Sequence, residues 1–287
     1  RFQDAADIRL YFPDIKSQYL IEIRTDVIGF KMLRTEKNKQ IVRVLGQLDE
    51  RVLRYVTEII VVNNRSTDQG ENAALTFCKE HMDLPVKILR NEENYGLGGS
   101  HKVAFLYAIK NHFDYVITLH GDDQGRIADF IPLLDGREYE EYDCCLGARF
   151  MKGSRLEGYN RIRVWGNYGF NILFSIVVRK SIKDLGSGLN LYKVEALRSK
   201  YFLKYPDTLY FNDFMILASC YYRQKLLFYP ISWREEDQVS NNKLWSFSVA
   251  LLKMLGNYVI GKKSYMERDM RTKKIEDYKA KIIYENK

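Results

Sequence analysis

Two adjacent carboxylates are the clearest candidates for chemistry in this sequence. Asp122 and Asp123 stand in the run His120-Gly121-Asp122-Asp123-Gln124, directly after the apolar stretch 115–119. A carboxylate buried without a partner is costly, so the pair requires a cation. Mg²⁺ or Mn²⁺ would fit, because Mg²⁺ is commonly held by one or two protein carboxylates, waters and substrate phosphate oxygens. The pair predicts a divalent-metal site; an acidic turn that only caps the next helix is the alternative.

Strand-like and helix-like segments alternate around these carboxylates. The runs 58–62, 86–89 and 115–119 are short and mostly apolar, as in parallel strands buried on both faces. Apolar residues at helical spacing predict helices over 38–55, 71–81 and 100–111. The alternation predicts a doubly wound, mostly parallel α/β sheet flanked by helices, in which ligands bind beyond the carboxyl ends of the strands.

The rest of the chain divides around this core. Residues 1–26 match no motif and are expected to form an N-terminal extension. Residues 27–243 are predicted to form one domain that begins with a short strand at 27–30. Its second half is more mixed, with strands expected at 144–149, 188–192 and 226–230 and helices at 160–179 and 213–224.

The C-terminal segment, 244–287, is predicted to be an interfacial extension. Residues 244–260 suit an amphipathic helix lying flat at a lipid boundary, and the basic residues after them are expected to be helical too. A core helix followed by a solvated one is the alternative. The sequence has no uncharged apolar run of 18 residues that would span a membrane. It starts at Arg1 without Met, so we expect it to belong to a longer chain. The missing part of that chain could contain a membrane span.

Composition narrows the class of partner. The chain has 287 residues, 46% of them hydrophobic and 29% charged, which excludes a disordered or fibrous protein. Its net charge of +8 predicts an anionic partner: nucleic acid, a lipid surface or a phosphorylated small molecule. The four cysteines form no CxxC pair, so free thiols in a reducing cytoplasm are expected.

Two motifs together resemble those of the family-two glycosyltransferases, which have the GT-A fold. The first, Asn63-Asn64-Arg65-Ser66-Thr67-Asp68, has asparagines where that family usually carries paired aspartates that contact a nucleotide. The second is 120–124, where His120 stands at the first metal-binding aspartate and Asp122 keeps the second. The resemblance implies that Asn63, Asn64 and Asp68 bind the donor. It also implies that Asp122, assisted by Asp123, holds the metal on the diphosphate.

Residues 27–245 further resemble the branch of dolichyl-phosphate mannose synthase and the polyprenyl-phosphate glycosyltransferases. The segments that carry this resemblance are 90–99, 147–150, 158–171, 184–192, Arg234 and 242–244. It implies that further donor-binding residues are Gly98, Arg149, Arg234 and Lys243. Two cations, Arg161 and Arg163, would hold an acceptor phosphate. Asp213 would face the acceptor, although a helix N-cap is the alternative for it.

The implied activity is inverting transfer of a sugar from a nucleotide sugar to a polyprenyl phosphate. The enzyme would be cytoplasmic and peripheral, at the inner face of an anionic membrane surface. A saccharide hydroxyl acceptor, as in capsule or lipopolysaccharide assembly, is the alternative, and it would need Asp213 as a general base. A basic nucleic-acid-binding protein is disfavoured, because helix-turn-helix spacing, zinc ligands and an RNA-binding aromatic motif are missing from the sequence.

Overall fold

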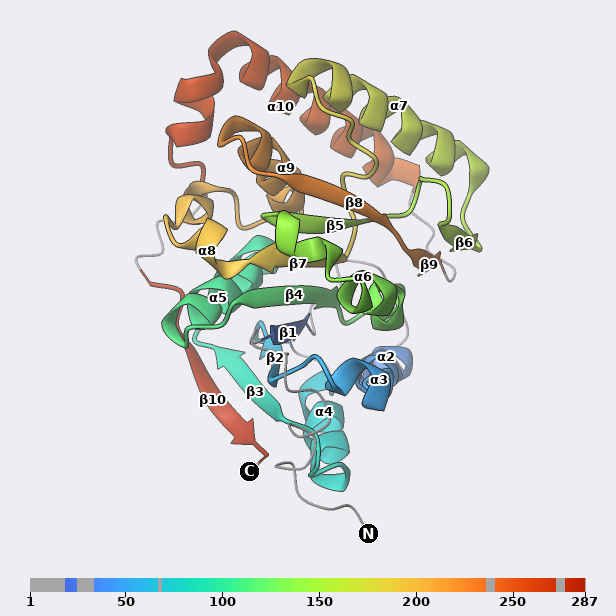
Figure 1. Ribbon diagram of the computed structural model, residues 1–287, viewed down its shortest axis with the longest axis vertical. Helices are drawn as coiled ribbons and strands as arrows, with labels where there is room; N and C mark the ends of the chain where they lie inside the picture. Colours follow the sequence, from blue (N-terminus) through green and yellow to red (C-terminus); the bar gives the residue numbers. More distant parts are fainter. Residues whose placement is uncertain (1–18, 25–33, 67–68, 236–240, 272–276, 287) are drawn as a thin grey trace.

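The computed structural model describes residues 19–24, 34–66, 69–235, 241–271 and 277–286 (Figure 1). Its centre is an eight-stranded sheet with the order β10-β3-β2-β1-β4-β7-β5-β8. The strands are β1 (Tyr19–Arg24), β2 (Glu58–Asn63), β3 (Val86–Asn91), β4 (Tyr115–His120), β5 (Cys144–Ala148), β7 (Leu189–Lys193), β8 (Leu226–Pro230) and β10 (Ala280–Glu285). A separate parallel pair joins β6 (Arg155–Glu157) and β9 (Ser232–Arg234).

The predicted α/β class is confirmed. Strand β1 pairs in parallel with β2 and β4, β2 with β3, and β5 with β8. Strand β7 runs antiparallel between β4 and β5, and β10 runs antiparallel to β3. The parallel strands therefore send their carboxyl ends to one edge of the sheet.

Helices cover both faces of the sheet because side chains alternate along each strand. In β2, Ile60 and Val62 pack toward one core cluster, and Ile59 and Val61 pack toward the other. The first cluster includes side chains of α5 (Gly96–Lys110), α7 (Arg161–Val178), α8 (Val194–Leu197), α9 (Phe211–Tyr221) and α10 (Asn241–Glu267). The second includes side chains of α2 (Arg34–Leu45), α3 (Glu50–Leu53), α4 (Gly70–Glu80) and α6 (Ile131–Asp135).

The central strand β1 lies inside the segment that we expected to be an extension. Leu20 and Ile21 are fully buried, and β1 separates β2 from β4. Residues 19–24 therefore belong to the sheet. Charged residues interrupt this short strand, so its pattern in the sequence is weak. The strand expected at 27–30 lies outside the described residues.

The helix expected over 38–55 is two helices. Helix α2 ends at Leu45, and α3 begins at Glu50 after the N-cap Asp49. The Asp49 carboxylate accepts hydrogen bonds from the backbone N–H groups of Arg51 and Val52, as an N-cap residue does. Apolar residues keep their spacing across the break, so periodicity alone does not reveal it.

The basic segment that we expected to be helical continues α10 as far as Glu267, but its residues 280–285 form strand β10. Strand β10 lies along β3, which would otherwise form the edge of the sheet (Figure 1). Just before β10, the Tyr278 hydroxyl donates to Asp207. The buried Lys102 of α5 donates to the Asp207 carboxylate (2.7 Å) and the Tyr278 hydroxyl (3.1 Å). Burial lowers the pKa of Lys102 to about 8. This buried cluster holds the C-terminal segment against α5.

Candidate functional site

Three loops that carry candidate residues meet at the carboxyl edge of the sheet. They follow β2 at Asn63, β3 at Asn91 and β4 at His120. These strands run parallel, with β1 between β2 and β4. The topology thus brings the asparagine motif and the 120–124 motif to the edge at which ligands bind in open α/β sheets.

Asn64 joins the loops after β2 and β3. Its side-chain oxygen accepts hydrogen bonds from Asn91 Nδ2 (2.9 Å) and from the backbone N–H of Tyr95 (2.8 Å). Its amide nitrogen donates to Asn94 Oδ1 at 2.9 Å. These contacts hold the two loops together at the edge of the sheet, and the donor contact of Asn64 stays a prediction.

Asn63 is held in a similar way. Its oxygen accepts from the backbone N–H of Ser66 (2.9 Å), and its nitrogen donates to Glu71 in α4. Arg90 Nε also donates to Glu71 at 2.8 Å and lowers the pKa of that carboxyl group. The remaining candidate of this motif, Asp68, lies outside the described residues.

The predicted donor residue Gly98 is packed against another loop. Its backbone N–H donates to the Asp207 carbonyl at 2.9 Å. A Cβ atom at Gly98 would lie 2.6 Å from the Pro206 carbonyl oxygen, so a larger residue would push the two backbones apart. Close approach of these segments accounts for the glycine, because its N–H group already has a partner within the protein.

Asp122 lies in the loop that follows β4. Its Oδ1 accepts from the backbone N–H of Gln124 (3.2 Å), and its Oδ2 lies 4.0 Å from Nδ1 of His120. In the part of the chain that the structure describes, no three His, Cys, Asp or Glu side chains gather around a metal-sized space. Mg²⁺ is commonly held by one or two protein carboxylates, waters and substrate oxygens, and the role of Asp122 as that carboxylate stays a prediction.

Asp123 is engaged differently. Its side chain is only 7% exposed, and its carboxylate forms an ion pair with Arg43 Nε (2.7 Å) and accepts from a terminal nitrogen of Arg234 (2.5 Å). Gln47 Nε2 donates to it at 3.1 Å. With three partners already on this carboxylate, the arrangement does not fit the predicted role as a metal ligand. Sequence reasoning missed Arg43 and Gln47, because a polar residue in an amphipathic helix or in the turn after it carries no signal of its own.

Arg149 forms a buried ion pair. Its guanidinium group donates to both carboxylate oxygens of Asp184, at 2.7 and 2.8 Å. Asp184 also accepts from the backbone N–H groups of Arg149 (2.8 Å) and Gly186 (3.0 Å). The guanidinium lies 5.1 Å from the Trp233 ring centroid. This predicted donor-binding residue is therefore fixed among protein groups.

Asp213 lies close to this ion pair. It is in the first turn of α9 and is 2% exposed. Burial raises the pKa of its carboxyl group well above the ordinary value; the negative Asp184 also raises it, whereas Arg149 opposes the shift. Nearby Asn212 donates from Nδ2 to the Ser187 carbonyl at 3.2 Å. The structure thus places Asp213 among buried polar groups beside Arg149.

The two predicted acceptor cations stand at the start of α7. Asn160 caps this helix by accepting from the backbone N–H of Ile162 at 2.8 Å. Arg163 pairs with Glu235, the residue after Arg234, whereas Arg161 is exposed. The start of α7 therefore lies beside the residues that meet at Asp123. The side chain of Lys243, in α10, is outside the described part.

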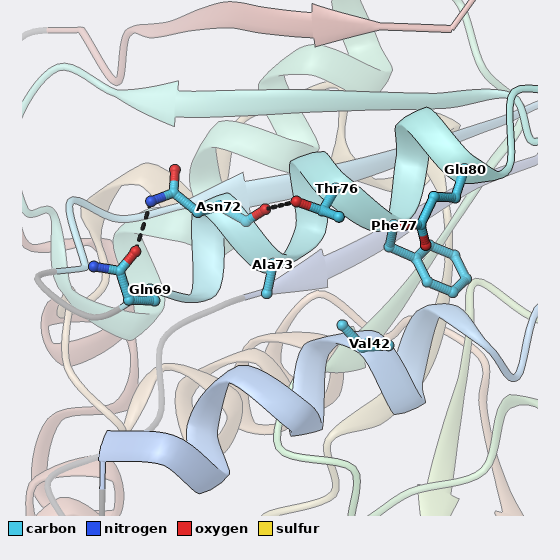
Figure 2. A pocket seen from close by; sticks show the side chains of 7 residues that line it. All are labelled: Val42, Gln69, Asn72, Ala73, Thr76, Phe77 and Glu80. Atoms are coloured by element: carbon cyan, nitrogen blue, oxygen red, sulfur yellow. Dashed lines mark hydrogen bonds between the residues drawn. The ribbon is translucent and has the colours of Figure 1, made fainter.

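A groove lies away from these residues. Figure 2 shows it between α2 and α4, with Val42 facing the side of α4 that carries Phe77; its volume is about 350 Å³. Hydrogen bonds within its wall join Gln69 to Asn72 and Thr76 to the Asn72 carbonyl. None of the predicted site residues lines this groove.

Sequence comparison finds related glycosyltransferases. The chain is 24% identical over 224 residues to dolichyl-phosphate beta-glucosyltransferase of Saccharomyces cerevisiae, which covers 73% of this chain and 65% of the yeast protein. It is 19% identical over 212 residues to the human protein of the same name, and this match covers 71% of this chain and 64% of the human protein. The chain thus spans about two thirds of the length of these relatives.

Structural comparison agrees with the GT-A fold. The glucosyl-3-phosphoglycerate synthase of Mycobacterium tuberculosis, solved with Mn²⁺, uridine-diphosphate-glucose and phosphoglyceric acid, superposes with a TM-score of 0.58. The match covers 91% of this chain and 85% of the other at 12% identity, so it is evidence for the fold alone. The glycosyl transferase family 2 model matches residues 26–199, more than half of the chain. The chain belongs to glycosyl transferase family 2.

Proposed function

We propose that this protein transfers a sugar from a nucleoside-diphosphate sugar to a polyprenyl phosphate, as a peripheral enzyme at the cytoplasmic face of a membrane. The observation that carries the proposal is the exposed apolar side of helix α7, which begins beside the candidate donor site. The names of the yeast and human relatives support a dolichyl-type acceptor.

Helix α7 presents an apolar stripe to solvent. No charged residue occurs between Arg163 and Arg179. Trp165 is 76% exposed and Ile172 is 60% exposed. At steps of three and four, one side of the helix carries Ile162, Trp165, Gly169, Ile172 and Ile176. Such a stripe on a protein surface indicates a contact with lipid or with a partner.

Helix α10 extends this surface. It packs beside α7 on the same side of the sheet (Figure 1). Leu251, Leu255 and Tyr258 face the core, whereas Trp245, Leu252 and Val259 face outward. Exposed cations on α10 are Lys253, Lys262 and Lys263. Each cation held near an anionic membrane contributes about 1 kcal/mol of attraction. Of the helices that the structure describes, none is long and apolar enough to cross a membrane.

The start of α7 connects this surface to the donor site. Arg163 pairs with Glu235, and the preceding residue, Arg234, donates to Asp123. A polyprenyl chain lying along α7 would therefore carry its phosphate toward Asp122. A phosphate monoester has a second pKa of about 6, so at neutral pH its oxygen is ionised and needs no general base.

The chemistry divides among few groups. Asp122 would hold a divalent metal, Mg²⁺ or Mn²⁺, which would neutralise charge on the leaving diphosphate. Arg234 and Lys243 would add positive charge there, and Arg161 or Arg163 would position the acceptor phosphate. The acceptor oxygen would attack the anomeric carbon and displace the nucleoside diphosphate, with inversion.

The first test concerns the α7 surface. Replacing Ile172 and Ile176 together with Glu is expected to lower the partition coefficient onto phosphatidylglycerol vesicles at least tenfold, because charged groups then face the lipid. Transfer to a polyprenyl phosphate in those vesicles should fall equally, while nucleoside-diphosphate affinity stays unchanged. Vesicle pelleting and release of the nucleoside diphosphate are the measurements.

Met82→Glu is the control, because Met82 is 64% exposed in the turn after α4, and α4 and α7 lie at opposite ends of the molecule (Figure 1). It should pellet like the wild type. If the wild type stays in the supernatant and transfers sugar to soluble saccharides, the lipid-acceptor proposal is wrong.

The second test concerns the saccharide-hydroxyl alternative. Because folding raises the pKa of Asp213, its carboxyl group favours the folded state below its ordinary titration range, and that contribution is lost as the pH rises through the folded value. Asp213→Asn should therefore raise the melting temperature more at pH 8 than at pH 5, and should retain transfer. Abolished transfer with normal folding would instead identify Asp213 as the base for a hydroxyl acceptor.

A further inference from the structure

We infer that Arg43 of α2 is a donor-binding residue, and that Asp123 is a positioning residue that holds Arg43 and Arg234 toward the diphosphate. The inference rests on the proposed function, because it names which groups of this chain meet the anionic part of the donor.

Side chains from separate parts of the chain contact Asp123. Arg43 reaches it from α2, and Gln47 from the turn after that helix. Arg234 reaches it from β9 and also donates to its backbone carbonyl at 3.2 Å. Gln47 further donates to the Gly125 carbonyl (3.3 Å) and accepts from the Ile127 N–H (3.1 Å). The turn after α2 is thereby joined to the loop that carries Asp122.

Asp123 faces two guanidinium groups, those of Arg43 and Arg234. Asp123 is nearly buried, whereas the side chains of Arg43 and Arg234 are 47% and 36% exposed. The buried carboxylate thus orients two arginines whose side chains keep an exposed part that an anion can reach. Guanidinium groups bind phosphate oxygens in a fixed geometry, so orientation matters for affinity.

The loop geometry separates the two adjacent carboxylates. Asp123 adopts a left-handed backbone conformation, with φ of 59°, and its side chain turns to the arginines. Asp122 bonds to the backbone of Gln124 and faces His120. The two carboxylates therefore point to different groups: Asp123 contacts the arginines, and Asp122 is the proposed metal ligand. Both act on the same diphosphate.

Inorganic pyrophosphate is a probe that does not depend on the nucleobase. It would be titrated calorimetrically into the full chain in Mn²⁺ and in EDTA, and the ratio of the two affinities measures the metal contribution. Arg43→Gln and Asp123→Asn should each weaken binding at least tenfold in both buffers and leave the ratio within twofold. Asp122→Asn should instead bring the ratio close to one. Arg43→Lys should recover part of the loss, since it keeps the charge.

Controls keep the result specific. Arg51→Gln removes the same charge from the exposed pair with Asp49, and it should bind pyrophosphate like the wild type. The double variant Arg43→Gln/Asp123→Asn should be little weaker than the weaker single variant, because Asp123 acts through Arg43.

Normal pyrophosphate affinity in Arg43→Gln, with an unchanged melting temperature, would overturn the role of Arg43. A ratio near one in Asp123→Asn would make Asp123 a metal ligand. A wild-type protein that binds no pyrophosphate in either buffer would overturn the proposed donor site, and this inference with it.

Discussion

Asp122→Asn is expected to lower kcat by about 10²–10³-fold, the usual cost of removing one group that stabilises charge in a transition state. In the proposed function Asp122, in the loop after β4, holds the metal, whereas Asp123 contacts Arg43 and Arg234. Asparagine keeps the size and the hydrogen bond to Gln124 but removes the charge. Steady-state rates with a nucleotide sugar and a polyprenyl phosphate would measure the loss.

Two further variants test whether the lost charge causes the lower rate of Asp122→Asn. Asp122→Glu keeps the carboxylate and should restore part of the rate, whereas Asp83→Asn, in an exposed turn, should leave the rate unchanged. Affinity for a nucleoside diphosphate should depend on Mn²⁺ in the wild type and not in Asp122→Asn. Full activity in Asp122→Asn, with equal affinity in Mn²⁺ and in chelator, would show that this site needs no metal ligand at Asp122.

Local patterns predicted most of the sheet. Strand β8 (Leu226–Pro230) begins and ends where the sequence predicted, and β2, β3 and β4 are each longer by one or two residues. Fully buried strands are continuous apolar runs, which a single segment of sequence displays. Strands β1 and β10 were missed because charged residues interrupt both. Strand β1 is a strand because it pairs with β2 and β4, and β10 is a strand because it pairs with β3.

The sequence predicted which loops form the candidate site, but it did not predict which side chains contact one another there. The position of Asp122 after a parallel strand follows from the alternation of strands and helices along the chain, which local patterns indicate. The contacts of Asp123 with Arg43 and Arg234 join residues far apart in the chain, so no spacing rule reveals them. The same holds for Arg149 and Asp184. Each was read from a motif, but their pairing depends on how β5 meets the loop before β7.

Breaking that pair is expected to be the largest single loss of stability. Asp184→Ala leaves the Arg149 guanidinium buried without its carboxylate, and such a change typically costs about 3–5 kcal/mol of unfolding free energy. Asp184 is almost fully buried and accepts four hydrogen bonds, two of them from the guanidinium group. Urea unfolding followed by tryptophan fluorescence would measure the change.

Arg149→Met/Asp184→Leu, which removes both charges, should cost less than Asp184→Ala, because no buried charge is left unpaired. Glu195→Ala breaks the exposed pair with Arg198 and should cost at most about 1 kcal/mol.

The function of Arg149 follows from one further variant. Arg149→Lys keeps the positive charge but cannot make the two parallel bonds to Asp184, so it should lose stability. If Arg149 supports the site through Asp184, affinity for a nucleoside diphosphate should stay within about threefold, well under the 1.4 kcal/mol that a tenfold change represents. If Arg149 itself contacts the diphosphate, Arg149→Lys will instead lose affinity well beyond threefold, in addition to the loss of stability.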